Sequence, residues 1–173
     1  MRWSLLCLLA LAACADAERP VPSAPLASSA AAPDTSEAPL RGAAVGQLVY
    51  VPAYSHVYSG DRQRPVDLAT TLSIRNTDGR DSIRLARVRY VGTEGRVLRS
   101  YLRSPRALGP LATAEFVVDE SDRAGGSGAS FLVEWTADGP VSAPVVEAVM
   151  ISTARQQGIS FVTEGRVVEE VRR

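Results

Sequence analysis

The chain has 173 residues, which is enough for one domain with an appendage but not for two domains of ordinary size. Its 19 basic and 19 acidic residues balance, which argues against an electrostatic nucleic-acid binder, because such proteins need clustered positive charge. Both cysteines, Cys7 and Cys14, lie at the amino-terminal end, so the rest of the chain holds no disulfide and no thiolate.

Residues 1–13 have the pattern of a secretory signal peptide. Arg2 supplies the positive charge, and an apolar core follows from Leu5 to Ala12. This core is too short to span a bilayer, which takes about 20 apolar residues. The segment ends in LAAC at Cys14, which resembles the bacterial lipobox. That resemblance implies cleavage before Cys14 and attachment of a diacylglyceryl group to its sulfur; the alternative is an ordinary signal peptide cut near Ala13 or Ala17.

Residues 14–46 are rich in Ala, Pro and Ser and show no hydrophobic periodicity. A segment of this composition buries too little apolar surface to offset its ordering entropy, so we expect a disordered tether behind the lipidated cysteine. Ala15, rather than Asp, follows Cys14. By analogy with enterobacterial sorting, this favours the outer membrane, with the protein facing the periplasm.

From Gln47 to the end, short alternating segments are separated by Gly, Pro, Asn and Asp, which predicts a β domain over 47–173. Pro52 should make the first strand an edge or break it. The alternation slips between Ile83–Leu85 and Val88–Tyr90, which predicts a β-bulge near Ala86-Arg87. Val145–Ser152 is apolar enough to predict burial on both faces. The alternating segments from which these strands are expected to form lie within 47–58, 67–75, 82–91, 96–102, 111–119, 129–136, 145–152, 159–162 and 166–171.

The predicted fold class is all-β: an antiparallel, immunoglobulin-like β-sandwich of seven to eight strands. The spacing of turns, near ten residues, is typical of that class. A small closed barrel is the alternative.

Four blocks of the domain resemble a bacterial domain-of-unknown-function family, number 3124. They are VYVPAYSHVY (49–58), LSIRNTD (72–78), PLATAEFVV (110–118) with the following Glu120-Ser121-Asp122, and ARQQGISF (154–161). The resemblance implies an exported β domain with no assigned activity, so it carries over no site residues. The strand–Asn–strand–Gly layout of the middle region is also similar to immunoglobulin-like modules of the FxLYD type.

The first candidate site is an aromatic stripe. His56 is the only histidine, and strand alternation places Tyr54, His56 and Tyr58 on one face. The stripe is either a half-exposed feature of an edge strand or a binding surface, since exposed aromatic residues are typical of recognition patches.

The second candidate is the acidic loop that contains Glu120 and Asp122, followed by a run of glycines. Its carboxylates could wrap a hard cation, although acidic Gly-rich loops are more commonly solvated turns.

The third candidate is the polar stretch with Arg155, Gln156 and Gln157. Its amides and guanidinium could grip a carboxylate or a sugar, or cap backbone groups of a hairpin loop.

No serine elbow, zinc-protease motif or phosphate-binding loop occurs in the sequence. We therefore expect a non-enzymatic, lipid-anchored binding or adaptor module of the cell envelope, without a cofactor, whose partners are the membrane and an envelope protein. The alternatives are a periplasmic metal- or small-ligand-binding protein that uses His56 and the acids of 119–122, and an enzyme of unfamiliar type.

Overall fold

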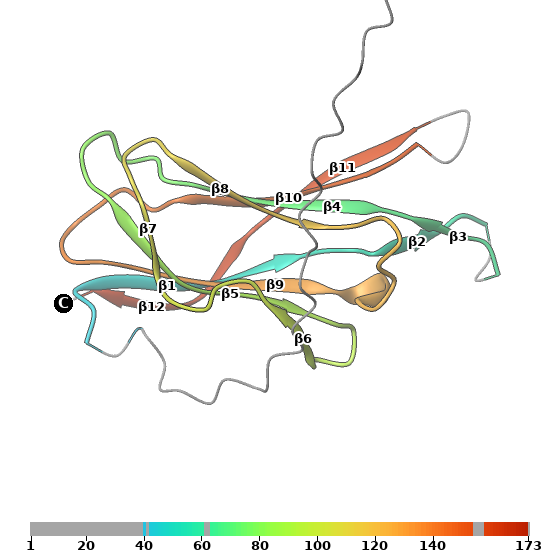
Figure 1. The fold of residues 1–173 in the computed structure, drawn as a ribbon, viewed down its shortest axis with the longest axis horizontal. Helices are drawn as coiled ribbons and strands as arrows, with labels where there is room; N and C mark the ends of the chain where they lie inside the picture. Colours follow the sequence, from blue (N-terminus) through green and yellow to red (C-terminus); the bar gives the residue numbers. More distant parts are fainter. Residues whose placement is uncertain (1–39, 41, 61–62, 154–157, 173) are drawn as a thin grey trace, which may run out of the picture.

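The structure is a computed structural model that describes residues 40, 42–60, 63–153 and 158–172. Its twelve strands form two face-to-face antiparallel sheets and a small hairpin (Figure 1). The first sheet has the order β12 (Arg166–Arg172), β1 (Val45–Pro52), β9 (Ser130–Ala137), β5 (Ile83–Val91) and β6 (Val97–Ser100), and β7 (Arg106–Leu108) also pairs with β5. The second has the order β11 (Ile159–Glu164), β10 (Val145–Ser152), β4 (Ala69–Arg75) and β8 (Thr113–Val118). The hairpin joins β2 (His56–Tyr58) to β3 (Pro65–Asp67), and a short 3-10 turn, η1 (Gly126–Gly128), precedes β9.

The core lies between the two sheets. Alternate residues of each strand point inward, as the period of two requires. On β9, Phe131, Val133 and Trp135 are buried, and they face Leu72 and Ile74 of the opposite layer within one hydrophobic cluster. The predicted all-β sandwich is therefore confirmed.

The bulge predicted near Ala86-Arg87 is confirmed. Leu85 pairs with Trp135 and Arg87 pairs with Glu134, so Ala86 is the extra residue opposite β9. Because of this insertion, both Leu85 and Val88 are buried in the core although they have opposite parity.

The strand count exceeds the predicted seven to eight. Three strands, β2, β3 and β7, have three residues each, which is too short to produce a visible alternation. Pro52 ends β1, so the break predicted there is confirmed. β1 is not an edge strand, because it lies between β12 and β9.

Gly165 marks the point where the chain passes from β11 in one sheet to β12 in the other. Its N–H donates to the Val146 carbonyl at 2.8 Å. A Cβ at this position would lie 2.6 Å from Val49 Cγ1 and 2.9 Å from that carbonyl oxygen. Only glycine fits where the two layers come this close.

Burial of β10 on both faces was the wrong prediction. Val146, Ala148, Met150 and Ser152 are buried, whereas Val145 and Ile151 are exposed. The second sheet packs on the first with one face only, and no other layer of the described chain covers its outer face.

Among the described residues, none forms a helix with the length and apolarity needed to cross a membrane.

Candidate binding surface

The outer face of the second sheet carries a row of β-branched residues across all four strands. Strand pairing places Val162 opposite Val149, Val149 opposite Thr71, and Thr71 opposite Val117. Their neighbours along the strands, such as Ala148, Leu72 and Phe116, are buried in the core, so this valine row points outward. Val117 and Val162, at its two ends, are 57% and 55% exposed.

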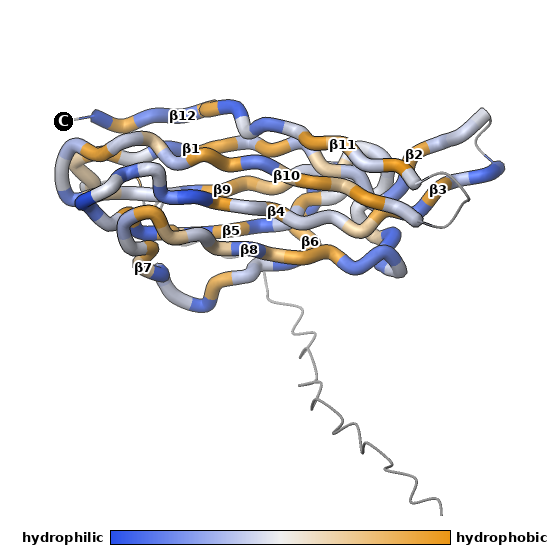
Figure 2. Tube along the Cα trace, turned by 90° about the horizontal axis from the view of Figure 1, so that it is seen from above, coloured by the Kyte–Doolittle hydropathy of each residue, from blue (hydrophilic) through white to orange (hydrophobic). Residues whose placement is uncertain are grey.

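Ile151 extends the apolar area on one side of the valine row. It pairs with Ala69 on β4 and Ser160 on β11 and is 47% exposed. In Figure 2, which looks onto this sheet, the four strands run side by side. The valine row and Ile151 thus form a continuous apolar strip on the outer face of the second sheet.

A parallel row of acids borders the strip on its other side. Glu164 pairs with Glu147, Glu147 with Ser73, and Ser73 with Glu115. Arg75 forms an ion pair with Glu147 at 2.8 Å. Glu115 and Glu164 are exposed and form no ion pair with other described residues. This glutamate row therefore leaves two free carboxylates beside the valine row.

The aromatic residues predicted as one stripe have different neighbours. His56 and Tyr58 contact each other, with ring centroids 5.3 Å apart and 3.3 Å between His56 Nε2 and the Tyr58 hydroxyl. Tyr54 packs edge-on against Phe161 of β11 at 5.7 Å. The structure therefore brings His56 and Tyr58 together and shows Tyr54 as part of the packing between strands.

His56 lies directly opposite Asp67 in the β2–β3 pair. The Asp67 Oδ2 accepts a hydrogen bond from Arg123. His56 Nδ1 and Asp67 Oδ1 are both buried and form no hydrogen bond with the described residues. Native structures seldom leave a buried carboxylate oxygen or imidazole nitrogen without a hydrogen bond unless there is a specific reason.

The acids of 119–122 turn toward three separate partners. Asp119 accepts hydrogen bonds from the Ser121 hydroxyl and N–H, which lower its pKa. Glu120 accepts from Ser152 Oγ at 3.1 Å. Asp122 pairs with Arg99 at 2.8 Å. In the part of the chain that the structure describes, no three His, Cys, Asp or Glu side chains gather to hold a metal ion.

The glycines after these acids are closely packed. A Cβ on Gly125 would lie 1.9 Å from the Tyr90 hydroxyl oxygen, and burial raises the pKa of Tyr90 to about 12. Ser55 N donates to the Gly126 carbonyl, and Thr93 N to that of Gly125. The loop is thereby tied to β5 and to the β2–β3 end of the sandwich.

The third candidate site cannot be placed, because Arg155, Gln156 and Gln157, like Cys14, lie outside the described residues.

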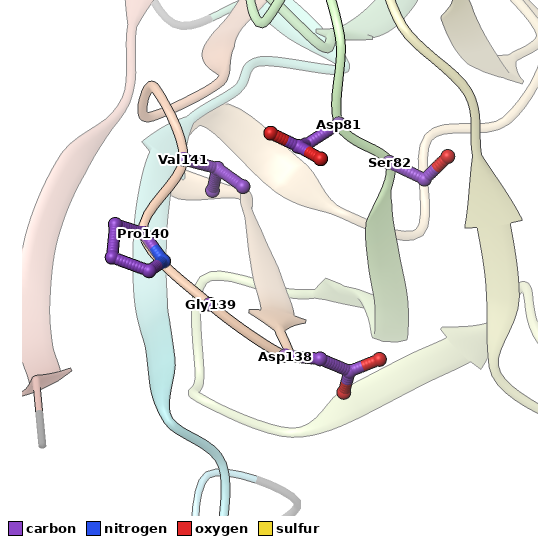
Figure 3. Close-up of a pocket in the computed structure, with 6 residues that line it drawn as sticks. All are labelled: Asp81, Ser82, Asp138, Gly139, Pro140 and Val141. Carbon is purple, nitrogen blue, oxygen red and sulfur yellow. The ribbon is translucent and has the colours of Figure 1, made fainter.

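A pocket of about 410 Å³ lies at the opposite end of the sandwich, where β9 ends and β5 begins. Figure 3 shows the Asp81 and Asp138 carboxylates on different sides of it, with Val141 on the loop that also carries Asp138. Its lining residues are Asp81, Ser82, Asp138, Gly139, Pro140 and Val141. Arg84 lies 3.4 Å from the Asp138 carboxylate, so this acid is already paired.

Neighbouring Asp78 organises the loops of that end. The backbone amides of Ser142, Asp81 and Arg80 donate to its carboxylate and lower its pKa to about 2. The buried Asn76 amide donates to the Asp81 and Gly109 carbonyls. These contacts hold the loops in place, so Asp78 and Asn76 have a structural role.

Residues 46–168 match the model of the family described as "Protein of unknown function (DUF3124)". The chain belongs to this family. No curated protein matches the chain. Among solved structures, it is similar to the crystal structure of Thermotoga maritima 1070, at 12% identity and a TM-score of 0.46, over 69% of this chain and 92% of that one.

The DUF3124 match includes both the valine row and the His56–Asp67 pair. Sequence reasoning missed the row because its four residues are outward positions of four strands, and their alignment depends on the register between strands. One signal was present: the surplus of apolar residues at both parities of Val145–Ser152. This surplus predicts burial on both faces, whereas in the structure it forms an apolar outer surface.

Proposed function

We propose that this DUF3124 protein is a lipid-anchored, non-enzymatic binding module of the cell envelope, which holds a partner protein on the valine row. The anchor follows from the LAAC sequence at Cys14. The Ala- and Pro-rich segment behind it supplies a spacer of about thirty residues between lipid and domain. Two or three acyl chains would hold such a protein stably on a membrane.

The observation that carries the proposal is the exposure of the valine row. Antiparallel sheets with one solvated face alternate apolar-in and polar-out, and on that basis the positions of Val117, Val149 and Val162 should be polar. Covering partly exposed Val117, Val162 and Ile151 would contribute about 1 kcal/mol each. A flat apolar strip with a charged border has the anatomy of a protein–protein interface.

Photo-crosslinking in living cells tests the proposal. A benzoylphenylalanine side chain is placed at Thr71, in the middle of the valine row, in the full-length protein. The matched control carries it at Arg84, an exposed position on β5 of the other sheet. We expect a discrete adduct from position 71 and none from position 84. Equal yields, or no adduct at 71, would overturn the proposal.

The lipid anchor needs a separate test. Cys14→Ser should move the protein from the membrane pellet to the soluble periplasmic fraction. Metabolic labelling with a radioactive fatty acid should mark the wild type and not the variant. A wild-type protein without the label would refute the anchor.

A second candidate function rests on the His56–Asp67 pair, since His56 Nδ1 and Asp67 Oδ1 are each buried without a hydrogen bond to the described residues. These atoms suit a small polar ligand or a transition-metal ion, which imidazole and carboxylate both bind. Calorimetry with Zn²⁺, Cu²⁺ and Ca²⁺ on the wild type, His56→Ala and Asp67→Asn tests it. Heat of binding that disappears in both variants supports this function, and a flat titration of the wild type rejects it.

A further inference from the structure

We infer that the partner of the valine row is a basic protein surface: an apolar strip bordered by Arg or Lys side chains that meet Glu115 and Glu164. This inference rests on the proposed function and names the chemistry of the partner. It follows from the two parallel rows of the outer face, one apolar and one acidic, which the strand register fixes.

The spacing of the rows defines what a partner must present. Residues two apart on a strand are separated by about 7 Å, so the glutamate row lies at that distance from the valine row. Glu115 and Glu164 are on the two outer strands of the sheet, three strand spacings apart, or about 14 Å. A matching partner therefore has two cationic side chains about 14 Å apart, on one side of an apolar strip.

Arg75 does not form an ion pair with either Glu115 or Glu164. Its guanidinium lies 2.8 Å from Glu147 and also donates to Ser73 Oγ at 3.2 Å, so it satisfies the centre of the glutamate row. The two ends remain negative. Covering them with an apolar surface would desolvate two charges without compensation, which is costly. A cationic border removes that cost and steers the approach of the partner.

The charges of Glu115 and Glu164 also disfavour a second copy of the chain, a nucleic acid or an anionic lipid surface on this face. If a second copy packed on this face with its two-fold axis along the strands, the glutamate rows would lie opposite each other. With the axis across the strands, each glutamate row would be buried against Ile151 and Ala69 of the other copy. A nucleic acid or an anionic lipid surface would meet like charge.

The experiment uses the adduct from benzoylphenylalanine at position 71 as its readout. In one variant Glu115 and Glu164 are both replaced by Gln, and in another Val117 and Val162 are both replaced by Thr. The matched control is Glu169→Gln, an exposed glutamate on β12 of the other sheet. Adduct yield is measured in isolated envelopes at low salt and at 0.5 M NaCl, and the crosslinked partner peptide is identified by mass spectrometry.

We expect the two glutamine substitutions to lower the yield several-fold at low salt and to remove most of its salt dependence, because screening acts on the same charges. The control should match the wild type, and the crosslinked peptide should lie beside Arg or Lys residues. If only the threonine substitutions lower the yield, the docking surface stands and the basic partner is refuted. An adduct of twice the mass of the chain would mean a second copy and would also refute it. If neither pair of substitutions changes the yield, the proposed function fails as well.

Discussion

Val149 on β10 lies directly opposite Val162 on β11, and both side chains point away from the core. A cross-strand pair of this kind normally stabilises a sheet by packing against its neighbours on the same face. Here Thr71 and Val117 continue the contact to the far edge of the sheet. The strip is ordered by the strands beneath it, so a partner meets a surface that needs little rearrangement.

Gly165→Ala should destabilise the domain by about 2 kcal/mol, because the added methyl group overpacks the point where the two layers meet. The new Cβ would lie 2.6 Å from Val49 Cγ1. Urea unfolding followed by tryptophan fluorescence measures the change. Gly139→Ala is the matched control, since nothing lies within 4 Å of its Cβ position, and its unfolding midpoint should stay near that of the wild type. Equal losses in both variants would contradict the packing at Gly165.

Leu111→Gly should stabilise the domain by up to about 1 kcal/mol, because it relieves a left-handed backbone conformation that L-residues disfavour. Leu111 has a φ of 55° and is 72% exposed. It occupies the third position of a turn closed by the Ala112 N–H and the Gly109 carbonyl, where glycine is preferred.

Leu111→Val tests the same strain in the opposite direction. A β-branched side chain tolerates positive φ least, so this variant should be less stable than the wild type by about 1 kcal/mol. Thermal unfolding should rank the three proteins Gly, Leu, Val in decreasing Tm. Any other order would show that the turn is not strained.

Glu134→Ala should cost about 3 kcal/mol, because it leaves two half-buried guanidinium groups without their shared carboxylate. Glu134 is almost fully buried on the outer face of the first sheet, between Arg87 and Arg89. Chemical denaturation measures the loss. Replacing Glu134, Arg87 and Arg89 together by apolar residues should cost less than the single change, and a larger cost would contradict this account of the cluster.

The Asp78 carboxylate should make stability fall in acid. Its pKa is lowered from 3.8 to about 2 by the amides of Ser142, Asp81 and Arg80. A depressed folded-state pKa contributes stability above the unfolded value, and that contribution is lost as the pH falls from about 4 toward 2. Urea midpoints measured from pH 6 to pH 2 should drop less steeply for Asp78→Asn than for the wild type. Parallel curves would show that Asp78 does not contribute.

The sequence predicted features that depend on one strand at a time. The slip at Ala86 is visible as a change of parity within β5, and the inward positions of β8 and β9 follow from alternation alone. Features that depend on neighbouring strands were not predictable. The composition of Val145–Ser152 predicts burial on both faces, because composition alone does not say whether a second layer covers a strand.

The contacts of the candidate site also divide into those within one strand and those between strands. His56 and Tyr58 are two positions apart on one strand, so their contact could be predicted. Asp67 and Arg123 join them through the β2–β3 pairing and an ion pair from a distant loop, which no local pattern reveals. The valine row depends on the register of four strands. The hypothesis of a cation site at 119–122 rests on the spacing of the acids, and that spacing does not show that each acid has its own partner.

The most direct test of the valine row compares the crosslinking yield at position 71 with stability in one variant. Val117→Thr and Val162→Thr together keep the size and branching of the side chains but make both ends of the row polar. We predict that this variant loses most of the position-71 adduct while its free energy of unfolding stays within about 0.5 kcal/mol of the wild type, as is usual for exposed positions. An undiminished adduct from a protein of unchanged stability would contradict the central claim that this face holds a partner.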